Sequence, residues 1–258
     1  MRIMHWIGYP FGLLLAAIRF LFIMGSMAFF IGIGMILIKL GWADQELAFK
    51  VRTWWCRMAI RLFGIRVHVS GRVDLSPGTL YVGNHRLFVD PILAFQYINN
   101  GWAVGKMEVS GYPLIHTGAV LSGVVYVERS NSDSRSRAKD AIVKLLSEKK
   151  SVLVFPEGTI SIDQGALPFR KGSFEAAAET NRPVVAFALE VGDPESDFWY
   201  KDGLISQYFK TFSKWRTDMY IHFFDPVWGN DGEALCARVQ EMIGTKMESF
   251  QKNWKSQP

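Results

Sequence analysis

The chain places a histidine and an aspartate at a spacing that suits proton transfer, in the run Asn84-His85-Arg86-Leu87-Phe88-Val89-Asp90. Histidine is the side chain that can take up a proton near neutral pH. A carboxylate on its far ring nitrogen would fix the tautomer of His85 and stabilise the imidazolium that forms. The chain contains no G-x-S-x-G elbow, so no serine nucleophile accompanies this histidine. The alternative interpretation is an ordinary strand end, with Asp90 starting a helix before Pro91.

Two clusters further along the chain could carry chemistry. Glu128 and Arg129 end an apolar run, and the planar guanidinium of Arg129 could hold a phosphate. The alternative for this cluster is a surface ion pair that contributes little to stability. The second cluster, Phe155-Pro156-Glu157-Gly158-Thr159, predicts a tight turn that can direct backbone N–H groups and a carboxylate into one cleft.

Arg170 and Lys171 follow this turn and open a predicted helix. Two cations beside the free N–H groups of a helix N-terminus form an anion site, although a solvated basic turn would have the same sequence. The remaining histidines show no metal-ligand spacing, and we predict no metal site. H-E-x-x-H, P-loop and G-x-G-x-x-G patterns are absent from the sequence. His116 is expected in a loop.

After Gly64, short apolar runs alternate with amphipathic ones. The pattern predicts strands at 65–70, 79–82, 123–127, 151–155, 183–189 and 219–224, and helices at 91–97, 135–149, 173–180 and 233–254. Alternating strands and helices favour an α/β sandwich. We therefore predict one α/β domain over residues 64–258, with a central sheet that is mostly parallel or mixed.

The first forty residues are strongly apolar. From Phe20 to Ile38 there are 19 residues without a charge, and as a helix they would span about 28 Å, close to the ~30 Å core of a bilayer. Apolar character begins at Phe11 and is interrupted by Arg19, which predicts either a tilted helix or a bent pair of helices, with Arg19 reaching the headgroups. A cleaved signal peptide is the alternative, but the apolar run continues beyond Ser26-Met27-Ala28, which favours an uncleaved anchor.

The next segment, 45–63, carries apolar residues at helical spacing, with basic residues on another side. Trp54 and Trp55 beside this basic face suit a helix in the headgroup region, and packing on the domain's own core is the alternative. We predict that residues 1–63 anchor the protein in a membrane. By the positive-inside rule, the domain that follows lies on the cytoplasmic face.

Composition narrows the classes of partner. Hydrophobic residues make up 49% of the 258 residues, and the net charge is +5. This charge suits anionic lipids, phosphorylated substrates or nucleic acid. The positive residues are spread over several segments without a recognition motif, so we expect no nucleic-acid partner. The two cysteines, Cys56 and Cys236, are far apart, and neither a disulfide framework nor a zinc site is expected.

Taken in order, the clusters resemble the 1-acyl-sn-glycerol-3-phosphate acyltransferases (lysophosphatidic acid acyltransferases) of the wider glycerolipid acyltransferase family. The motifs that carry the resemblance are Asn84-His85-x-x-x-x-Asp90, Gly123 to Glu128-Arg129, Phe155 to Thr159, and Phe169-Arg170-Lys171-Gly172. They span roughly residues 67–189. The family often has a second proline where this chain has Ala186, and that block shapes the substrate pocket.

The resemblance implies a reaction. His85, oriented by Asp90, would deprotonate the sn-2 hydroxyl of lysophosphatidic acid, and the alkoxide would attack an acyl thioester without an acyl-enzyme. The implied co-substrate is acyl-CoA or acyl carrier protein, with no cofactor, and the product is phosphatidic acid for phospholipid biosynthesis. The implied substrate-binding residues are Asn84, Glu128, Arg129, Glu157, Gly158, Thr159, Arg170 and Lys171.

Two alternatives remain open from the sequence. The first is the same chemistry on another acceptor, such as a lysophospholipid with a full headgroup or lyso-ornithine lipid, which the Ala186 departure leaves possible. The second is a membrane-associated lipid-binding protein without catalytic activity. Binding alone has no need of a base, so the combination of His85, Asp90, Glu157 and Gly158 argues against it.

Overall fold

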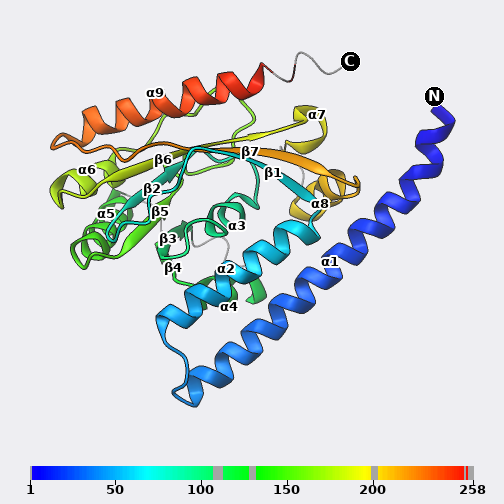
Figure 1. Cartoon of the computed structure of the whole chain (residues 1–258), viewed down its shortest axis with the longest axis horizontal. Coiled ribbons are helices and arrows are strands. Elements are labelled where there is room, and N and C mark those ends of the chain that lie inside the picture. Colours follow the sequence, from blue (N-terminus) through cyan, green and yellow to red (C-terminus); the bar gives the residue numbers. More distant parts are fainter. Residues whose placement is uncertain (1, 107–112, 128–131, 199–202, 253, 255–258) are drawn as a thin grey trace.

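The central element is a mixed sheet with strand order β1-β7-β6-β2-β5-β3-β4 (Figure 1). The computed structural model describes residues 2–106, 113–127, 132–198, 203–252 and 254. Neighbouring strands are parallel except β6 and β7, which are antiparallel. The strands are β1 (Ile65–Ser70), β2 (Leu80–Gly83), β3 (Gly101–Lys106), β4 (Val124–Val127), β5 (Ser151–Val154), β6 (Val184–Val191) and β7 (Thr217–Phe223).

Helices cover both faces of this sheet, which confirms the α/β sandwich. Strand β6 shows why, because successive side chains point to opposite faces of a strand. Val184, Ala186 and Ala188 pack in one core with the helices α5 (Ser132–Ser147), α6 (Gly172–Glu179) and α9 (Gly232–Gln251). Val185 and Phe187 pack in the other core, with α1 (Arg2–Lys39), α2 (Gln45–Leu62), α3 (Asp90–Phe95) and α8 (Leu204–Phe212). Every residue of β6 is buried.

All the strands and helices predicted after residue 64 are present, with ends that differ by a few residues. Four elements were not predicted: β3, α4 (Pro113–Leu121), α7 (Pro194–Asp197) and α8. The expectation of a loop around His116 is wrong, because this residue lies in α4. Helix α4 is short, begins with proline and contains Gly118, so it has little helical signal of its own. Its contacts with α1 supply the stability that its sequence lacks.

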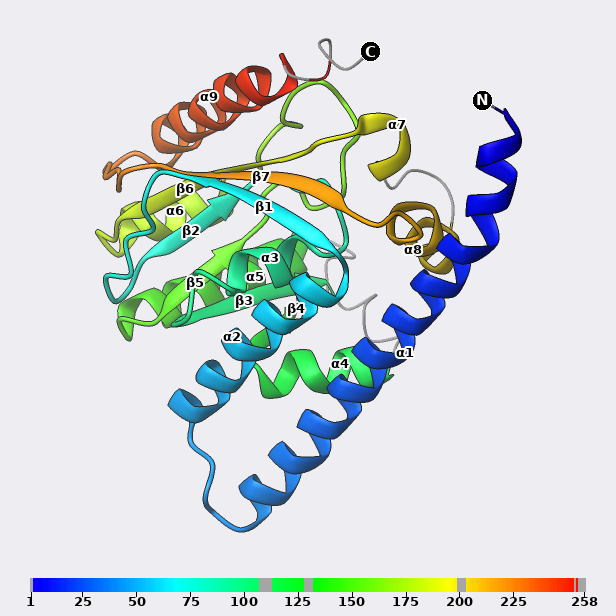
Figure 2. The same ribbon diagram turned by 45° about the vertical axis from the view of Figure 1, so that its right-hand side comes forward.

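Helix α1 is one continuous helix that runs along one side of the molecule (Figure 2). Its segment Pro10–Lys39 is long and apolar enough to cross a membrane, judged by length and composition. Ala16 and Ile23 face the protein core. Large apolar side chains at helical spacing stay exposed on the outer side: Phe11, Leu14, Ile18, Leu21, Phe22, Phe29 and Ile36.

Arg19 does not reach towards headgroups as predicted. Its guanidinium donates hydrogen bonds to the carbonyl oxygens of Phe212 and Lys214, at 2.9 and 2.6 Å, and of Trp215 at 2.8 Å. These carbonyls lie at and just beyond the C-terminus of α8, where helix oxygens lack intrahelical partners and the helix dipole favours a cation. Arg19 therefore fastens α1 to the domain.

Helix α2 begins after Asp44, whose side chain accepts a hydrogen bond from the Leu47 backbone N–H at 2.7 Å. Its inner face buries Cys56, Ala59 and Ile60 against the core, so the alternative of packing on the domain holds for this face. The outer face leaves Trp54 55% exposed. Helix α2 thus lies between α1 and the sheet, and its inner face bounds the space in front of the histidine motif.

Candidate active site

The histidine motif begins where β2 ends, between β6 and β5 in the middle of the sheet. Gly83 is required there, because a Cβ would lie 2.1 Å from the Phe187 ring. Asn84 is fully buried, and its side-chain amide exchanges two hydrogen bonds with the backbone of Leu189, at 2.9 and 2.7 Å. Asn84, predicted as a substrate-binding residue, therefore uses its amide to fix the direction in which the chain leaves the sheet.

His85 and Asp90 are in contact, as their spacing predicted. The His85 Nδ1 and Asp90 Oδ2 atoms are 2.7 Å apart. The same oxygen accepts the backbone N–H groups of Arg86 at 2.5 Å and Leu87 at 2.7 Å, and Asp90 is fully buried at the start of α3. Three donors thus hold one carboxylate oxygen. Because Nδ1 is occupied, Nε2 is the ring nitrogen left to exchange a proton with a substrate.

The imidazole ring has a defined orientation at the edge of a cavity. It stacks on Phe155 with ring centroids 4.6 Å apart, and 18% of its side chain is exposed. Phe155 in turn meets Phe187 edge to face, at 6.0 Å. Phe155 therefore supports one face of the imidazole ring, and the Asp90 carboxylate holds its Nδ1 edge.

Glu157 ties the turn after β5 to the histidine motif. One carboxylate oxygen accepts the backbone N–H of His85, and the other accepts the backbone N–H of Leu167, each at 2.9 Å. Burial raises the pKa of Glu157, and these two backbone hydrogen bonds oppose that rise. The predicted role of Glu157 was contact with substrate, whereas in this arrangement both of its oxygens hold backbone amides.

Some of the residues predicted to bind the substrate's anionic group lie at the His85 cavity, and Lys171 does not. Gly158, with φ of 72°, and Thr159 line the same cavity as His85. The Arg170 guanidinium lies over Gly158, where a Cβ would be 2.9 Å from Arg170 Cζ. Lys171 is directed away, towards Glu175 at 3.7 Å and Glu233 at 3.5 Å. Glu128 and Arg129 lie outside the described residues.

The cavity has a volume of about 790 Å³. It extends from His85, Gly158 and Thr159 to Leu37, Ile38 and Asp44, where α1 connects to α2. Its walls come from α1, α2, α3, α4 and the ends of the central strands. Most lining side chains are apolar, among them Met27, Phe30, Ile31, Trp55, Phe88, Ile92, Phe95 and Leu121. A chamber of this shape suits a flexible hydrocarbon chain whose reactive end is at the histidine.

Arg52 is a buried cation on the cavity wall that the sequence did not reveal as a site residue. It donates to the carbonyl oxygens of Gly101 at 2.6 Å and Ser122 at 2.8 Å, and its guanidinium lies over the rings of Phe49 and Phe95. Burial lowers the pKa of Arg52 to about 10. Its place four residues before Cys56, at helical spacing from Ala59 and Ile60, was the available signal.

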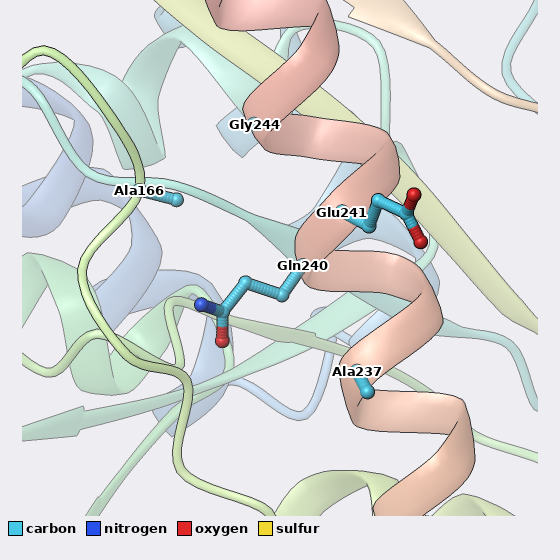
Figure 3. Close-up of a pocket in the computed structure, with 5 residues that line it drawn as sticks. All are labelled: Ala166, Ala237, Gln240, Glu241 and Gly244. Carbon is cyan, nitrogen blue, oxygen red and sulfur yellow. The ribbon is translucent and has the colours of Figure 1, made fainter.

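A second cleft, of about 350 Å³, lies between α9 and the segment that contains Ala166 (Figure 3). Figure 3 shows Gln240 extending from α9 towards this segment, while Glu241 points elsewhere. Gln240 accepts a hydrogen bond from the Phe169 backbone N–H at 2.9 Å. Among the described residues this cleft shares no lining residue with the His85 cavity. Gln240 holds Phe169 in the segment that follows the Glu157-Gly158-Thr159 turn.

Ala186 has a different environment from the one its motif suggested. It is fully buried and packs in the core under α9. Phe187, the next residue, faces the opposite core and contacts Phe155 beside the histidine. The departure from proline at Ala186 therefore lies on the face of the sheet away from the cavity.

The chain matches known proteins over the residues that form this site. Residues 64–190 match the family model described as Acyltransferase. A 1-acyl-sn-glycerol-3-phosphate acyltransferase from Limnanthes alba is 31% identical over 134 residues, which are 51% of this chain and 48% of the relative. A lyso-ornithine lipid O-acyltransferase from Brucella abortus is 25% identical over 185 residues, which are 71% of this chain and 67% of the relative.

The fold also has a counterpart among solved structures. The 1-acyl-sn-glycerophosphate (LPA) acyltransferase PlsC from Thermotoga maritima superposes with a TM-score of 0.71, at 19% identity, over 98% of each chain. This likeness shows the fold, including the helices before the sheet. The chain spans about half the length of the Limnanthes relative.

Proposed function

We propose that this protein transfers a fatty acyl chain from an acyl thioester to the sn-2 hydroxyl of 1-acyl-sn-glycerol-3-phosphate. One observation carries the proposal: the His85–Asp90 pair, joined at 2.7 Å, opens onto an apolar cavity of about 790 Å³. A base at the end of a hydrocarbon-sized chamber suits acyl transfer to a lipid. The family of residues 64–190 and the names of the similar relatives support the same reaction class.

In the proposed mechanism, His85 Nε2 takes the proton of the acceptor hydroxyl while the oxygen attacks the thioester carbonyl. The C–O bond forms, the C–S bond of the tetrahedral intermediate breaks, and the leaving thiolate takes the proton from the imidazolium. Asp90 stabilises that imidazolium, and no acyl-enzyme forms. General-base catalysis contributes about 10²–10⁴-fold, and positioning of both substrates supplies much of the remainder.

The acceptor headgroup would lie at the rim formed by Gly158, Thr159 and Arg170. The Arg170 guanidinium supplies positive charge directly over Gly158, and we expect Arg129 to supply a second planar cation for the phosphate. Glu157 acts by holding the turn in place. The acyl chain would occupy the apolar cavity, and acyl-CoA or acyl carrier protein would supply the thioester without a further cofactor.

We infer that the exposed stripe of α1 contacts lipid and that the catalytic domain lies on the cytoplasmic side. Large apolar side chains such as Phe11, Leu21 and Phe29 are 60–70% exposed there, which is unfavourable in water. Placing aspartate at these three positions together should release the protein from phospholipid vesicles and leave its thermal unfolding unchanged. A triple variant that remains bound to vesicles would contradict the lipid contact.

A crossed assay tests the reaction. Purified full-length protein in mixed micelles would receive lysophosphatidic acid, a lysophospholipid with a full headgroup or lyso-ornithine lipid, each with acyl-CoA or acyl carrier protein as donor. We expect turnover with lysophosphatidic acid and none with the His85→Ala variant. Turnover confined to lyso-ornithine lipid would favour the second candidate, which the Brucella relative supports. Absence of turnover with every acceptor would contradict both.

A further inference from the structure

Arg86, the residue after the proposed base, is fully buried. A buried guanidinium is costly unless its N–H groups are satisfied and its charge is paired. Arg86 Nη1 donates to the carbonyl oxygens of Ser161 at 2.9 Å and Asp163 at 2.7 Å. Its Nη2 donates to Glu190 Oε2 at 2.8 Å. The Arg86 side chain thus joins the histidine motif to residues 161–163, which follow the Glu157-Gly158-Thr159 turn, and to strand β6.

Glu190 is a fixed partner for this arginine. It is fully buried on β6, and its oxygens also accept the side-chain N–H of Gln251 at 2.9 Å and the backbone N–H of Val191 at 3.0 Å. Burial raises the pKa of Glu190, and the charge of Arg86 opposes that rise. Because Gln251 ends α9, the arginine is anchored to both the sheet and the last helix.

The anchored segment forms part of the cavity rim. The backbone N–H of Ser161 donates to the His85 carbonyl at 2.9 Å, and Glu157 holds the His85 N–H. Residues 158–160, which line the cavity, therefore lie between two attachment points on the histidine itself. Arg86 reinforces the attachment at Ser161, because its guanidinium binds the carbonyl oxygens of Ser161 and Asp163.

We propose that Arg86 is a positioning residue for acyl transfer, which sets the distance between His85 and the acceptor-binding rim at residues 158–160. This inference rests on the proposed function. A buried ion pair of this kind contributes little net stability, since apolar pairs of similar volume often replace such pairs without loss. The geometry that Arg86 imposes on the rim is then its main contribution.

The double variant Arg86→Met/Glu190→Leu tests this role without leaving a buried charge unpaired. We expect its unfolding temperature to fall modestly, because the Val191 N–H and the Ser161 carbonyl lose their partners, and the rates are compared at a temperature where both proteins stay folded. Its kcat should fall about 100-fold, the effect of misplacing reacting groups by roughly 1 Å, and its KM for the acceptor should rise while the KM for the donor thioester stays the same. Arg182→Met, which removes a half-buried arginine bonded to the Leu146 carbonyl, is the matched control and should leave kcat and both KM values unchanged.

Hydrogen exchange of the backbone amides gives a second measurement that needs no substrate. We expect faster exchange in residues 158–163 of the double variant and unchanged exchange in β6. Should the double variant not fold, Arg86→Lys keeps the charge but reaches fewer acceptors, and the same changes are expected in weaker form. A folded variant with unchanged kcat, or with unchanged exchange in residues 158–163, would overturn the proposal. If the unsubstituted protein acylates no lyso-lipid, the proposed function fails, and the exchange measurement still decides whether Arg86 holds the rim.

Discussion

Replacing Asp90 with asparagine separates charge from geometry at the proposed base. Asp90 Oδ2 accepts the His85 Nδ1–H and the backbone N–H groups of Arg86 and Leu87. An asparagine oxygen in that place keeps all three hydrogen bonds and loses the negative charge beside the imidazolium. Hydrogen bonds to charged groups contribute about 1.5–3 kcal/mol and neutral ones about 0.5–1.5 kcal/mol. The difference, about 1–2 kcal/mol, predicts a fall in kcat of roughly 5- to 30-fold.

Initial rates of acyl transfer to lysophosphatidic acid, measured beside thermal unfolding, check this prediction. Asp90→Asn should lose some stability, because its amide nitrogen takes the buried Oδ1 position, which has no hydrogen-bond partner. Asp90→Ala is the contrast, because it leaves the Arg86 and Leu87 amides without their acceptor, at about 1–3 kcal/mol each, and should lose more stability than Asp90→Asn as well as activity. An Asp90→Asn variant with unchanged kcat, or an Asp90→Ala variant of unchanged stability, would refute this reasoning.

Three further predictions follow from particular contacts. Glu157→Gln places its NH2 group against one of the two backbone N–H groups that Glu157 now accepts. The free energy of unfolding should therefore fall by about 1–3 kcal/mol. An unchanged melting temperature with a raised KM for the acceptor would instead support direct substrate contact. Arg19→Met removes three hydrogen bonds to the end of α8 and should lower stability by about 1.5–3 kcal/mol, measured by urea unfolding, without changing kcat. Gly118→Leu fills the cavity beside Ile31, where a Cβ would be 3.1 Å from the Ile31 side chain. The ratio of kcat/KM for palmitoyl over decanoyl thioester should then fall about tenfold or more, and an unchanged ratio would place the acyl chain elsewhere.

Much of the fold could be predicted because local patterns determine it. Strand β6 begins with an uninterrupted apolar run over residues 184–189, and α9 repeats apolar residues at helical spacing. Helix α4 could not be predicted in this way, because its stability comes from contact with α1, about 90 residues earlier in the chain. The hydrogen-bond partners of Arg19 could not be predicted either, because they lie 193 to 196 positions away in the chain.

The site shows the same division. His85 and Asp90 are close in sequence, so their spacing indicated the pair. Glu157 accepts the backbone N–H of His85, 72 positions away in the chain, and Arg86 contacts Glu190, 104 positions away. The resemblance to the acyltransferase family therefore assigned Glu157 to substrate binding, and no motif pointed to a role for Arg86. Whether Arg129 contributes to the phosphate site stays a prediction.

The central claim is that His85 is the base for acyl transfer to a lipid hydroxyl. Single-turnover transfer from a labelled acyl thioester to lysophosphatidic acid, compared between the unsubstituted protein and His85→Ala, tests it most directly. The account predicts a rate about 10²–10⁴-fold lower in the variant, with unchanged vesicle binding and unfolding temperature. A rate within a few fold of the unsubstituted protein, in a variant that folds and binds vesicles normally, would contradict it.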